Sequence, residues 1–163
     1  MIVPKYLIVI AVVAVAAVVA VSIVVTMYTG NTSIARLEYE VKRIMIDDVL
    51  LDVEIADDDE KRALGLMYRD SLEEYKGMLF IFPYEGKYAF WMMNMNFSID
   101  IIWIDSEGKV VYIVDNALPC SMVASTSECT YEPDVHAKYV LEVNGGFAER
   151  HGVTIGSRMI ILD

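Results

Sequence analysis

A long uncharged apolar segment near the N-terminus is the strongest constraint on this chain. The run from Tyr6 to Val25 contains no charged residue, and Ser22 is its only strongly polar member. At about 1.5 Å rise per residue, a helix of this length spans about 30 Å, the thickness of the hydrocarbon core of a bilayer. A single segment in lipid must be helical, because every backbone polar group needs a partner there. The sequence therefore predicts one transmembrane helix.

We interpret this segment as a signal anchor over residues 1–27, with the lipid bilayer as the partner of residues 6–25. The alternative is a cleaved signal peptide, for which Ala20 and Ser22 would form the small-residue cleavage site. The apolar residues 23–25 continue past that site, which favours the anchor.

The chain beyond the anchor divides into a short linker over residues 28–35 and a domain over residues 36–163. All 24 acidic residues and every basic residue of the 13 except Lys5 lie beyond the apolar run, which leaves a net charge of −12 there. Nucleic-acid binding needs a basic surface, so we expect no nucleic-acid partner. We also expect no cofactor and no metal.

The two cysteines indicate the compartment. Cys120 and Cys129 lie in one polar loop, and a disulfide between them fits an oxidising environment; the alternative is two separate thiols. The positive-inside rule opposes this placement, since Arg36, Lys42 and Arg43 follow the run, but long domains translocate largely regardless of charge. We therefore expect a single-pass protein of the cell membrane with its C-terminal domain outside the cytoplasm.

The domain shows the patterning of strands. Residues 49–55 alternate apolar and polar side chains, and residues 99–105 and 109–115 form an apolar hairpin around Ser106-Glu107-Gly108. Because both hairpin strands are apolar on both faces, we expect both to be central in the sheet. The other expected strands are residues 36–46, 77–83, 88–93, 139–143 and 158–162, and the expected helices begin at Asp57, at Ser71 for a single turn, and near Phe147. The predicted fold is mainly β: a β-sandwich or a curled antiparallel sheet with two or three short helices.

Several short motifs occur in a fixed order along the domain: Ala56-Asp57 to Arg62, Gly65-Leu66-Met67-Tyr68-Arg69, Gly77-Met78-Leu79-Phe80, Phe90-Trp91-Met92, Ile99-Asp100-Ile101, Tyr139 to Val143, and Gly145-Gly146 with Gly156. Together they resemble the Domain of Unknown Function 192 family, also called uncharacterised protein family 0127, over roughly residues 44–163. The resemblance implies a small, mainly β domain, often with an N-terminal signal or anchor, and so a membrane-anchored member of that family here.

The resemblance also bears on single residues. A cysteine pair ahead of a Tyr-Pro loop occurs in the family and is similar to Cys120, Cys129 and Tyr131 here. The chain departs from the family pattern at Met93 and Met95, where a basic residue and a Thr are usual. The resemblance implies a fold and no particular reaction.

Polar residues inside apolar strands mark the candidate site. Asp100 shares a strand face with Ile102, and Glu142 shares one with Val140. A buried carboxylate must be paired or neutral, which a structural network such as Asp100 with Arg69 would achieve. The other interpretation is a ligand pocket whose candidate residues are Arg69, Trp91, Asn94, Asp100, Tyr131 and Glu142. In it, Trp91 forms the floor and its indole N–H bonds Asp100 or Glu142.

Three functions follow from these residues. We expect a module that binds a small molecule or a protein partner and is not an enzyme. The alternative is a hydrolase or transferase that uses Asp100 and Glu142, which requires the two carboxylates to face one open cleft. The third is a copper-binding protein with soft ligands, drawn from Met67, Met78, Met92, Met93, Met95 and His136.

Overall fold

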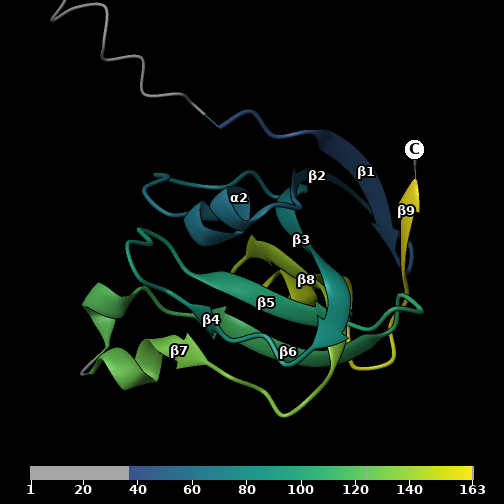
Figure 1. Cartoon of the computed structure of the whole chain (residues 1–163). Helices are drawn as coiled ribbons and strands as arrows, with labels where there is room; N and C mark the ends of the chain where they lie inside the picture. The colour runs from purple at the N-terminus through teal and green to yellow at the C-terminus, as the bar shows by residue number, and fades with distance from the viewer. Residues whose placement is uncertain (1–36, 124, 163) are drawn as a thin grey trace, which may run out of the picture. The chain divides into compact units, whose positions relative to one another are not determined.

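The computed structural model of the chain describes residues 37–123 and 125–162, and residues 39–163 cluster as one unit (Figure 1). The predicted membrane segment and linker lie outside the described residues. Within the described residues, no helix has both the length and the apolar character needed to cross a membrane.

The main element is a mixed sheet of seven strands in the order β6-β5-β8-β3-β2-β1-β9. The strands are β1 (Val41–Ile46), β2 (Val49–Ala56), β3 (Lys76–Gly86), β5 (Ile99–Ile104), β6 (Val110–Ala117), β8 (Ala137–Asn144) and β9 (Met159–Leu162). All neighbours are antiparallel except β2 and β3, which are parallel. The mainly β prediction is confirmed, and the sheet is mixed because this one pair departs from the antiparallel sheet that the sequence suggested.

The parallel pair arises from a crossover that contains α2 (Asp59–Leu64). The side chain of Asp58 caps the helix by accepting a hydrogen bond from Lys61 N at 2.8 Å, so the cap lies one residue after the predicted Asp57. The helix ends at Gly65, whose φ of 51° is readily adopted by glycine. The single helical turn expected at Ser71 does not form. The second helix, α3 (Phe147–His151), lies where the sequence predicted it.

The predicted hairpin is present as β5 and β6. Strand β5 lies between β6 and β8, and every one of its residues is buried because a hydrophobic core covers each face of the sheet there. The expectation that both strands are central is wrong for β6, which ends the sheet and exposes part of its length.

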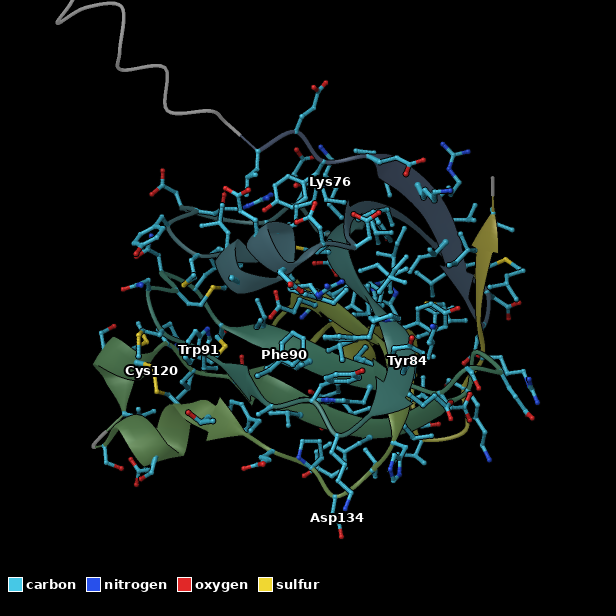
Figure 2. All side chains as sticks on the ribbon, viewed as in Figure 1. Lys76, Tyr84, Phe90, Trp91, Cys120 and Asp134 are labelled. Carbon is cyan, nitrogen blue, oxygen red and sulfur yellow. A yellow bond between two sulfur atoms is a disulfide. The ribbon has the colours of Figure 1, made fainter. Side chains whose placement is uncertain are left out.

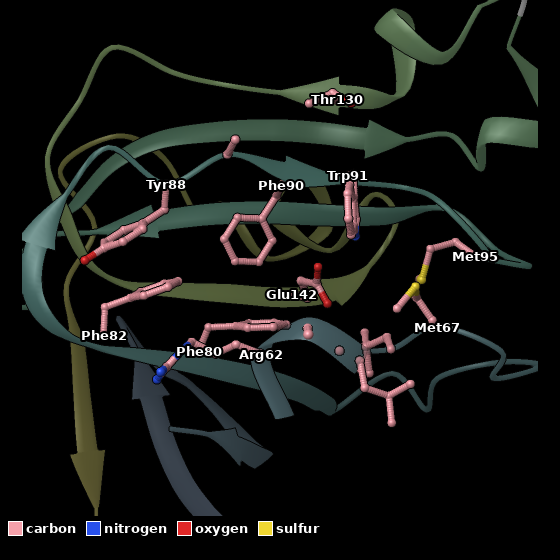
Figure 3. A pocket seen from close by; sticks show the side chains of 15 residues that line it. Arg62, Met67, Phe80, Phe82, Tyr88, Phe90, Trp91, Met95, Thr130 and Glu142 are labelled. Carbon is pink, nitrogen blue, oxygen red and sulfur yellow. The ribbon is translucent and has the colours of Figure 1, made fainter. Parts of the chain in front are cut away.

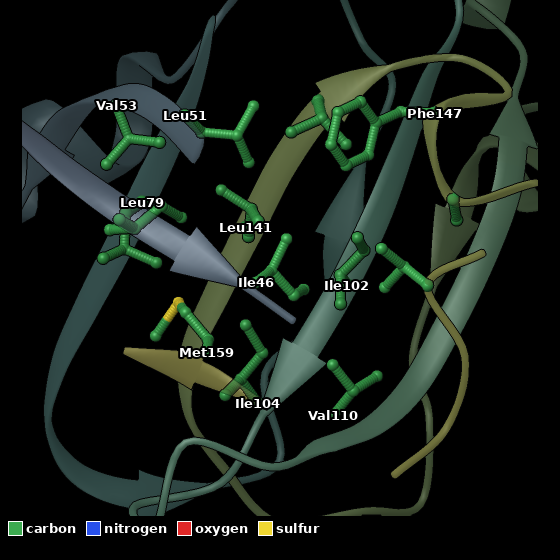
Figure 4. Packing of buried hydrophobic residues seen from close by; sticks show 14 of the residues in the cluster. Ile46, Leu51, Val53, Leu79, Ile102, Ile104, Val110, Leu141, Phe147 and Met159 are labelled. Atoms are coloured by element: carbon green, nitrogen blue, oxygen red, sulfur yellow. The ribbon is translucent and has the colours of Figure 1, made fainter. Parts of the chain in front are cut away.

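The sheet curls until its two ends meet. Lys109 and Arg158 form an isolated bridge, Val110 N donates to Ser157 O at 2.8 Å, and Met159 N donates to Gly108 O at 2.7 Å. The side chains that meet across this curl form the first core (Figure 4), which α3 covers with Phe147. The predicted curl is therefore present.

A second core covers the opposite face of the sheet. It includes Met78, Phe80, Trp103 and Val140 from the sheet and Leu66 from the segment after α2. Strand pairing explains the division, because alternate residues of β3 and β8 point to opposite faces. The pocket described below lies on this second face.

Asp100 is buried beneath the sheet's first face and holds α3 in place. Its carboxylate accepts hydrogen bonds from three backbone N–H groups, those of Asn116 (2.8 Å), Gly146 (2.8 Å) and Ala148 (2.7 Å). The side chain is completely inaccessible. The structural interpretation of Asp100 is therefore correct, but its partners are backbone groups and not Arg69.

A small second sheet covers one end of this face. Strand β4 (Phe90–Trp91) pairs with β7 (Thr130–Tyr131), and β7 follows two 3₁₀ turns, η1 (Cys120–Met122) and η2 (Thr126–Cys129). The predicted disulfide between Cys120 and Cys129 is present, with Cα atoms 5.2 Å apart. Met92 N donates to Cys129 O at 2.8 Å, and Cys120 N donates to Met92 O at 3.2 Å, so the disulfide loop lies beside Trp91 (Figure 2).

Candidate functional site

A pocket of about 370 Å³ opens between α2, the middle of β3, β4 and the second face of the sheet at β8 (Figure 3). Most of its lining is apolar or aromatic. The residues that line it are Arg62, Ala63, Leu64, Gly65, Leu66, Met67, Phe80, Phe82, Tyr88, Ala89, Phe90, Trp91, Met95, Thr130 and Glu142.

Aromatic rings in mutual contact form one wall. Phe80 and Phe90 meet edge to face with ring centroids 4.8 Å apart, and Phe82 stacks on Tyr88 at 3.5 Å. Phe90 also meets Trp103, whose indole N–H donates to Tyr88 O at 2.9 Å. These contacts fix the ring positions, so the wall is preformed.

Glu142 places one carboxylate inside this apolar pocket. The residue is 5% exposed, and its cross-strand neighbours Met78 and Ile101 are fully buried. Its Oε2 atom has no hydrogen-bond partner among the described residues. Burial raises the pKa of the Glu142 carboxyl to about 8, against a smaller opposing effect of the Arg69 guanidinium.

Two arginines are the candidate counter-ions of Glu142: Arg69, whose charge acts on its carboxyl, and Arg62 in the pocket lining. Both are bound to other groups. Arg69 forms a bidentate ion pair with Glu54, with both N–O distances at 2.7 Å. Arg62 donates to Ile81 O at 2.8 Å and to Asp59 at 2.7 Å, and its guanidinium lies 5.4 Å from the centre of the Phe82 ring. The pocket therefore holds a carboxylate without a dedicated counter-ion.

Two residues with left-handed backbone lie close together beside the pocket. Tyr68 has φ of 64° and Asn94 has φ of 57°. Tyr68 N donates to Asn94 O at 2.9 Å, and Asn94 Nδ2 donates to the Tyr68 hydroxyl at 2.9 Å. This backbone is strained for Tyr, and the reciprocal bonds maintain it. They tie together the segments that carry the pocket residues Met67 and Met95.

The structure brings two of the six candidate residues into the pocket lining, Trp91 and Glu142. Asn94 and Arg69 contact neighbouring segments. Tyr131 is opposite Phe90 in the β4–β7 pair and is outside the lining. Trp91 is 52% exposed. Its indole makes no hydrogen bond with the described residues, so the expected bond to Asp100 or Glu142 is not formed.

Asp100 and Glu142 lie on opposite faces of the sheet. Asp100 is paired with Val143 and Ile101 is paired with Glu142 in the β5–β8 register, and paired residues share a face. The two carboxylates cannot meet in one cleft, so the alternative in which Asp100 and Glu142 form a catalytic pair is wrong. In the pairing of β5 with β8, Asp100 and Glu142 are one position out of register, so their side chains point to opposite faces. The apolar pattern of one strand does not show its register with another strand.

The six proposed copper ligands are divided among different environments. Met67 and Met95 line the pocket, Met78 and Met92 are fully buried, and Met93 and His136 are exposed. Among the described residues, no group of three or more His, Cys, Asp and Glu side chains could hold a metal ion.

Several lining residues were not among the sequence candidates, chiefly Arg62, Phe80, Phe82, Tyr88 and Phe90. Phe80 and Phe82 are two residues apart in one strand, which places both rings on one face. This spacing was a usable signal. The sequence contains no such signal for the contribution of α2 to the lining, because that contribution depends on how the crossover packs against the sheet.

Comparisons with known proteins agree with this fold. Residues 42–161 match the model of the family DUF192, described as Uncharacterized ACR. A UPF0127 protein of Pyrococcus abyssi (strain GE5 / Orsay) is 34% identical over 112 residues, which cover 66% of this chain and 83% of the relative.

Two solved structures are also similar. One, described as a candidate transcription regulator from Sinorhizobium meliloti 1021, has a TM-score of 0.69 and 32% identity, over 77% of this chain and 97% of that protein. The other, a protein of unknown function from Novosphingobium aromaticivorans DSM 12444, has a TM-score of 0.67 and 27% identity, over 74% and 84%.

Proposed function

This chain belongs to the uncharacterised DUF192 family, and we propose that its domain is a binding module whose pocket around Glu142 takes a small molecule with an apolar body. One observation carries the proposal: a buried carboxylate with an unpartnered oxygen lines a preformed aromatic pocket. An unpaired buried polar atom is costly to a fold. A ligand that supplies the missing partner explains why this atom is tolerated.

The size and chemistry of the pocket support this proposal. Ligand pockets are mainly apolar clefts of roughly 300–1,000 Å³ with a few polar groups that orient the ligand, and this pocket of about 370 Å³ has that character. Binding fits better than acid/base catalysis, because Glu142 is the only carboxylate in the described lining.

A nucleic-acid function is not proposed. The similar Sinorhizobium protein is described as a candidate transcription regulator, but the net charge of −11 on the present chain would repel the phosphate backbone.

Binding can be tested with the full chain in lipid nanodiscs, with empty nanodiscs as the blank. The probes are phenethylammonium and phenethyl alcohol, and the binding of each is measured by titration calorimetry. We expect one site per chain, and we expect Trp91→Ala to weaken binding by about tenfold because it removes apolar contact with the ligand. Met93→Ala is the matched control, since Met93 is 41% exposed and outside the lining. Absence of binding by both probes, or equal effects of the two variants, would refute the proposal.

We also propose that residues 1–27 anchor this module in the cell membrane with the domain outside the cytoplasm. The uncharged run over residues 6–25 and the disulfide support this arrangement.

The anchor is tested by expressing the full chain in a bacterial host. We expect the chain to stay in the membrane pellet after alkaline extraction and to be cut by protease added outside spheroplasts. The variant Val13→Arg/Val18→Arg should be extracted, because charges at the centre of a span oppose insertion. A chain that is extracted without these substitutions, or protected from outside protease, would contradict the anchor or its direction.

A further inference from the structure

We propose that the ligand of this pocket is an organic ammonium ion with an apolar body, whose cationic nitrogen pairs with the Glu142 carboxylate. The inference rests on the proposed function and specifies the class of ligand. Three features of the pocket carry it: the missing counter-ion, the aromatic surroundings of the carboxylate, and the space beside it.

The missing counter-ion is the first feature. No described residue donates a hydrogen bond to Glu142 Oε2. Arg69 is committed to Glu54 through two short bonds, and Arg62 is committed to Asp59 and a backbone carbonyl. A buried carboxylate is stable when ionised only with a paired cation. No residue in the described part of the chain supplies one, so a cation from the ligand completes the site.

The aromatic surroundings are the second feature. Figure 3 shows the Glu142 carboxylate lying between Phe80 and Trp91, with the Phe90 ring beside Trp91. The faces of aromatic rings attract ammonium groups, most strongly where water is excluded. Rings and a carboxylate in one pocket favour a cation over a neutral group. The acidic chain, of net charge −11, also favours cations over anions in the approach to the pocket.

The space beside the carboxylate is the third feature. Gly65 follows α2, and a Cβ atom built there would lie 3.9 Å from Glu142 Oε2 and 3.3 Å from the Phe80 ring. A side chain at this position would crowd the Phe80 ring and approach the oxygen. Glycine keeps this part of the pocket lining free of a side chain, and because Oε2 itself is buried, an ammonium nitrogen pairs with it when the Glu142 side chain turns toward the pocket.

A proton balance follows from this pairing. Burial raises the pKa of Glu142 to about 8, so the free carboxyl is mostly protonated at pH 7. Arg69, beyond α2, is the charged group that acts on this carboxyl, and Arg62 and Tyr88 are the other ionisable residues of the lining. Both of these bond other groups, since Arg62 donates to Ile81 O and Asp59 and the Tyr88 hydroxyl donates to Tyr84 O. A bound ammonium lowers the pKa of the carboxyl, and its proton leaves for solvent. Binding of an ammonium near pH 7 therefore releases close to one proton, whereas a neutral ligand releases none.

The experiment compares three probes of similar shape: phenethylammonium, phenethyl alcohol and 3-phenylpropanoate. Each is titrated at pH 7 into the full chain in nanodiscs, in buffers that differ in ionisation enthalpy, so that proton release is measured directly. We expect the ammonium to bind at least about tenfold more tightly than the alcohol, with release of close to one proton, and the carboxylate to bind most weakly.

The variant Glu142→Gln keeps the shape of the side chain and removes its charge. It should weaken ammonium binding by about tenfold or more and abolish proton release, while binding of the alcohol changes little. Unchanged alcohol binding also shows that the variant is folded. Equal affinities for the ammonium and the alcohol, no proton release, or full ammonium affinity in Glu142→Gln would each overturn the ammonium proposal alone. Failure of all three probes to bind the unmodified chain would overturn the proposed function as well.

Discussion

Glu142 is the residue whose environment departs most from what a fold requires. It lies in β8 between apolar neighbours, and none of residues 37–123 and 125–162 gives its Oε2 atom a hydrogen bond. Buried carboxyls usually have hydrogen-bond donors, as Asp100 has in the same sheet. The contrast between the two residues separates a carboxylate that supports the fold from one that is available to a ligand.

The free energy of unfolding of the ligand-free protein should depend on pH because of Glu142. The folded pKa of about 8 lies above the ordinary value of 4.5, so between these values the folded state holds a proton that the unfolded state has released. The free energy of unfolding contributed by Glu142 therefore falls as pH rises through this window, by up to about 1.4 kcal/mol per pH unit, and is constant above it.

This effect is measured by urea unfolding of the unmodified chain and Glu142→Gln from pH 5 to pH 9. The variant should lack this component, so the stability difference between the two proteins should shift in favour of the variant as pH rises to about 8. Parallel pH profiles for the two proteins would show that Glu142 titrates normally.

Asp100 offers a second prediction at this scale. Asp100→Asn replaces one acceptor oxygen by a donor that faces backbone N–H groups, so we expect the free energy of unfolding to fall by about 3 kcal/mol. Asp115→Asn is a suitable control, because Asp115 is exposed. Chemical denaturation of the two variants measures the difference, and equal stabilities would contradict the role assigned to Asp100.

Among the secondary-structure elements, the β4–β7 pair connects the pocket to the disulfide. It carries three pocket residues, Phe90, Trp91 and Thr130, and the Cys120–Cys129 disulfide lies directly beside it. Because Met92 is bonded to both cysteines through the backbone, the disulfide loop supports this wall of the pocket.

Removal of the disulfide should therefore affect both stability and binding. In the chain-entropy model, a closed loop of this length contributes about 2–3 kcal/mol to the free energy of unfolding. We expect Cys120→Ser/Cys129→Ser to lose about that amount and to bind phenethylammonium more weakly. Calorimetry and thermal unfolding measure the two effects. Unchanged affinity in the double variant would show that the pocket wall does not depend on the disulfide.

The elements also show what the sequence could predict. Alternation located β2, and apolar runs with a Gly-containing turn located the β5–β6 hairpin, because these signals lie within a few residues. The parallel pairing of β2 and β3 could not be predicted, since it depends on the path of the crossover through α2. The edge position of β6 depends on the order of strands in the sheet, which the apolar pattern of the strand itself does not contain, so β6 was wrongly placed inside the sheet.

The candidate site was also predictable only in part, where the signal lay within a few residues of the sequence. Glu142 and Trp91 stood out as unusual residues in apolar strands, and both line the pocket. The partners of Asp100 were hidden, because the N–H groups of Gly146 and Ala148 lie 46 and 48 residues away in sequence. A backbone donor that is distant in sequence cannot be identified from the residues on either side of Asp100.

The whole molecule combines an acidic domain, a pocket in which Glu142 has no counter-ion among the described residues, and a proposed membrane anchor. The charge of the chain attracts cations, and the proposed anchor would tether the domain to the membrane. The family relation gives the fold but no ligand, so the account depends on the chemistry of Glu142.

The most direct test is an NMR titration of the Glu142 side-chain carboxyl in the full chain, assigned by comparison with Glu142→Gln, with and without phenethylammonium. The account predicts a pKa of about 8 in the free protein, lowered by about two units when the ammonium is bound. A Glu142 pKa near 4.5 in the free protein, or a raised pKa that saturating ammonium leaves unchanged, would contradict it.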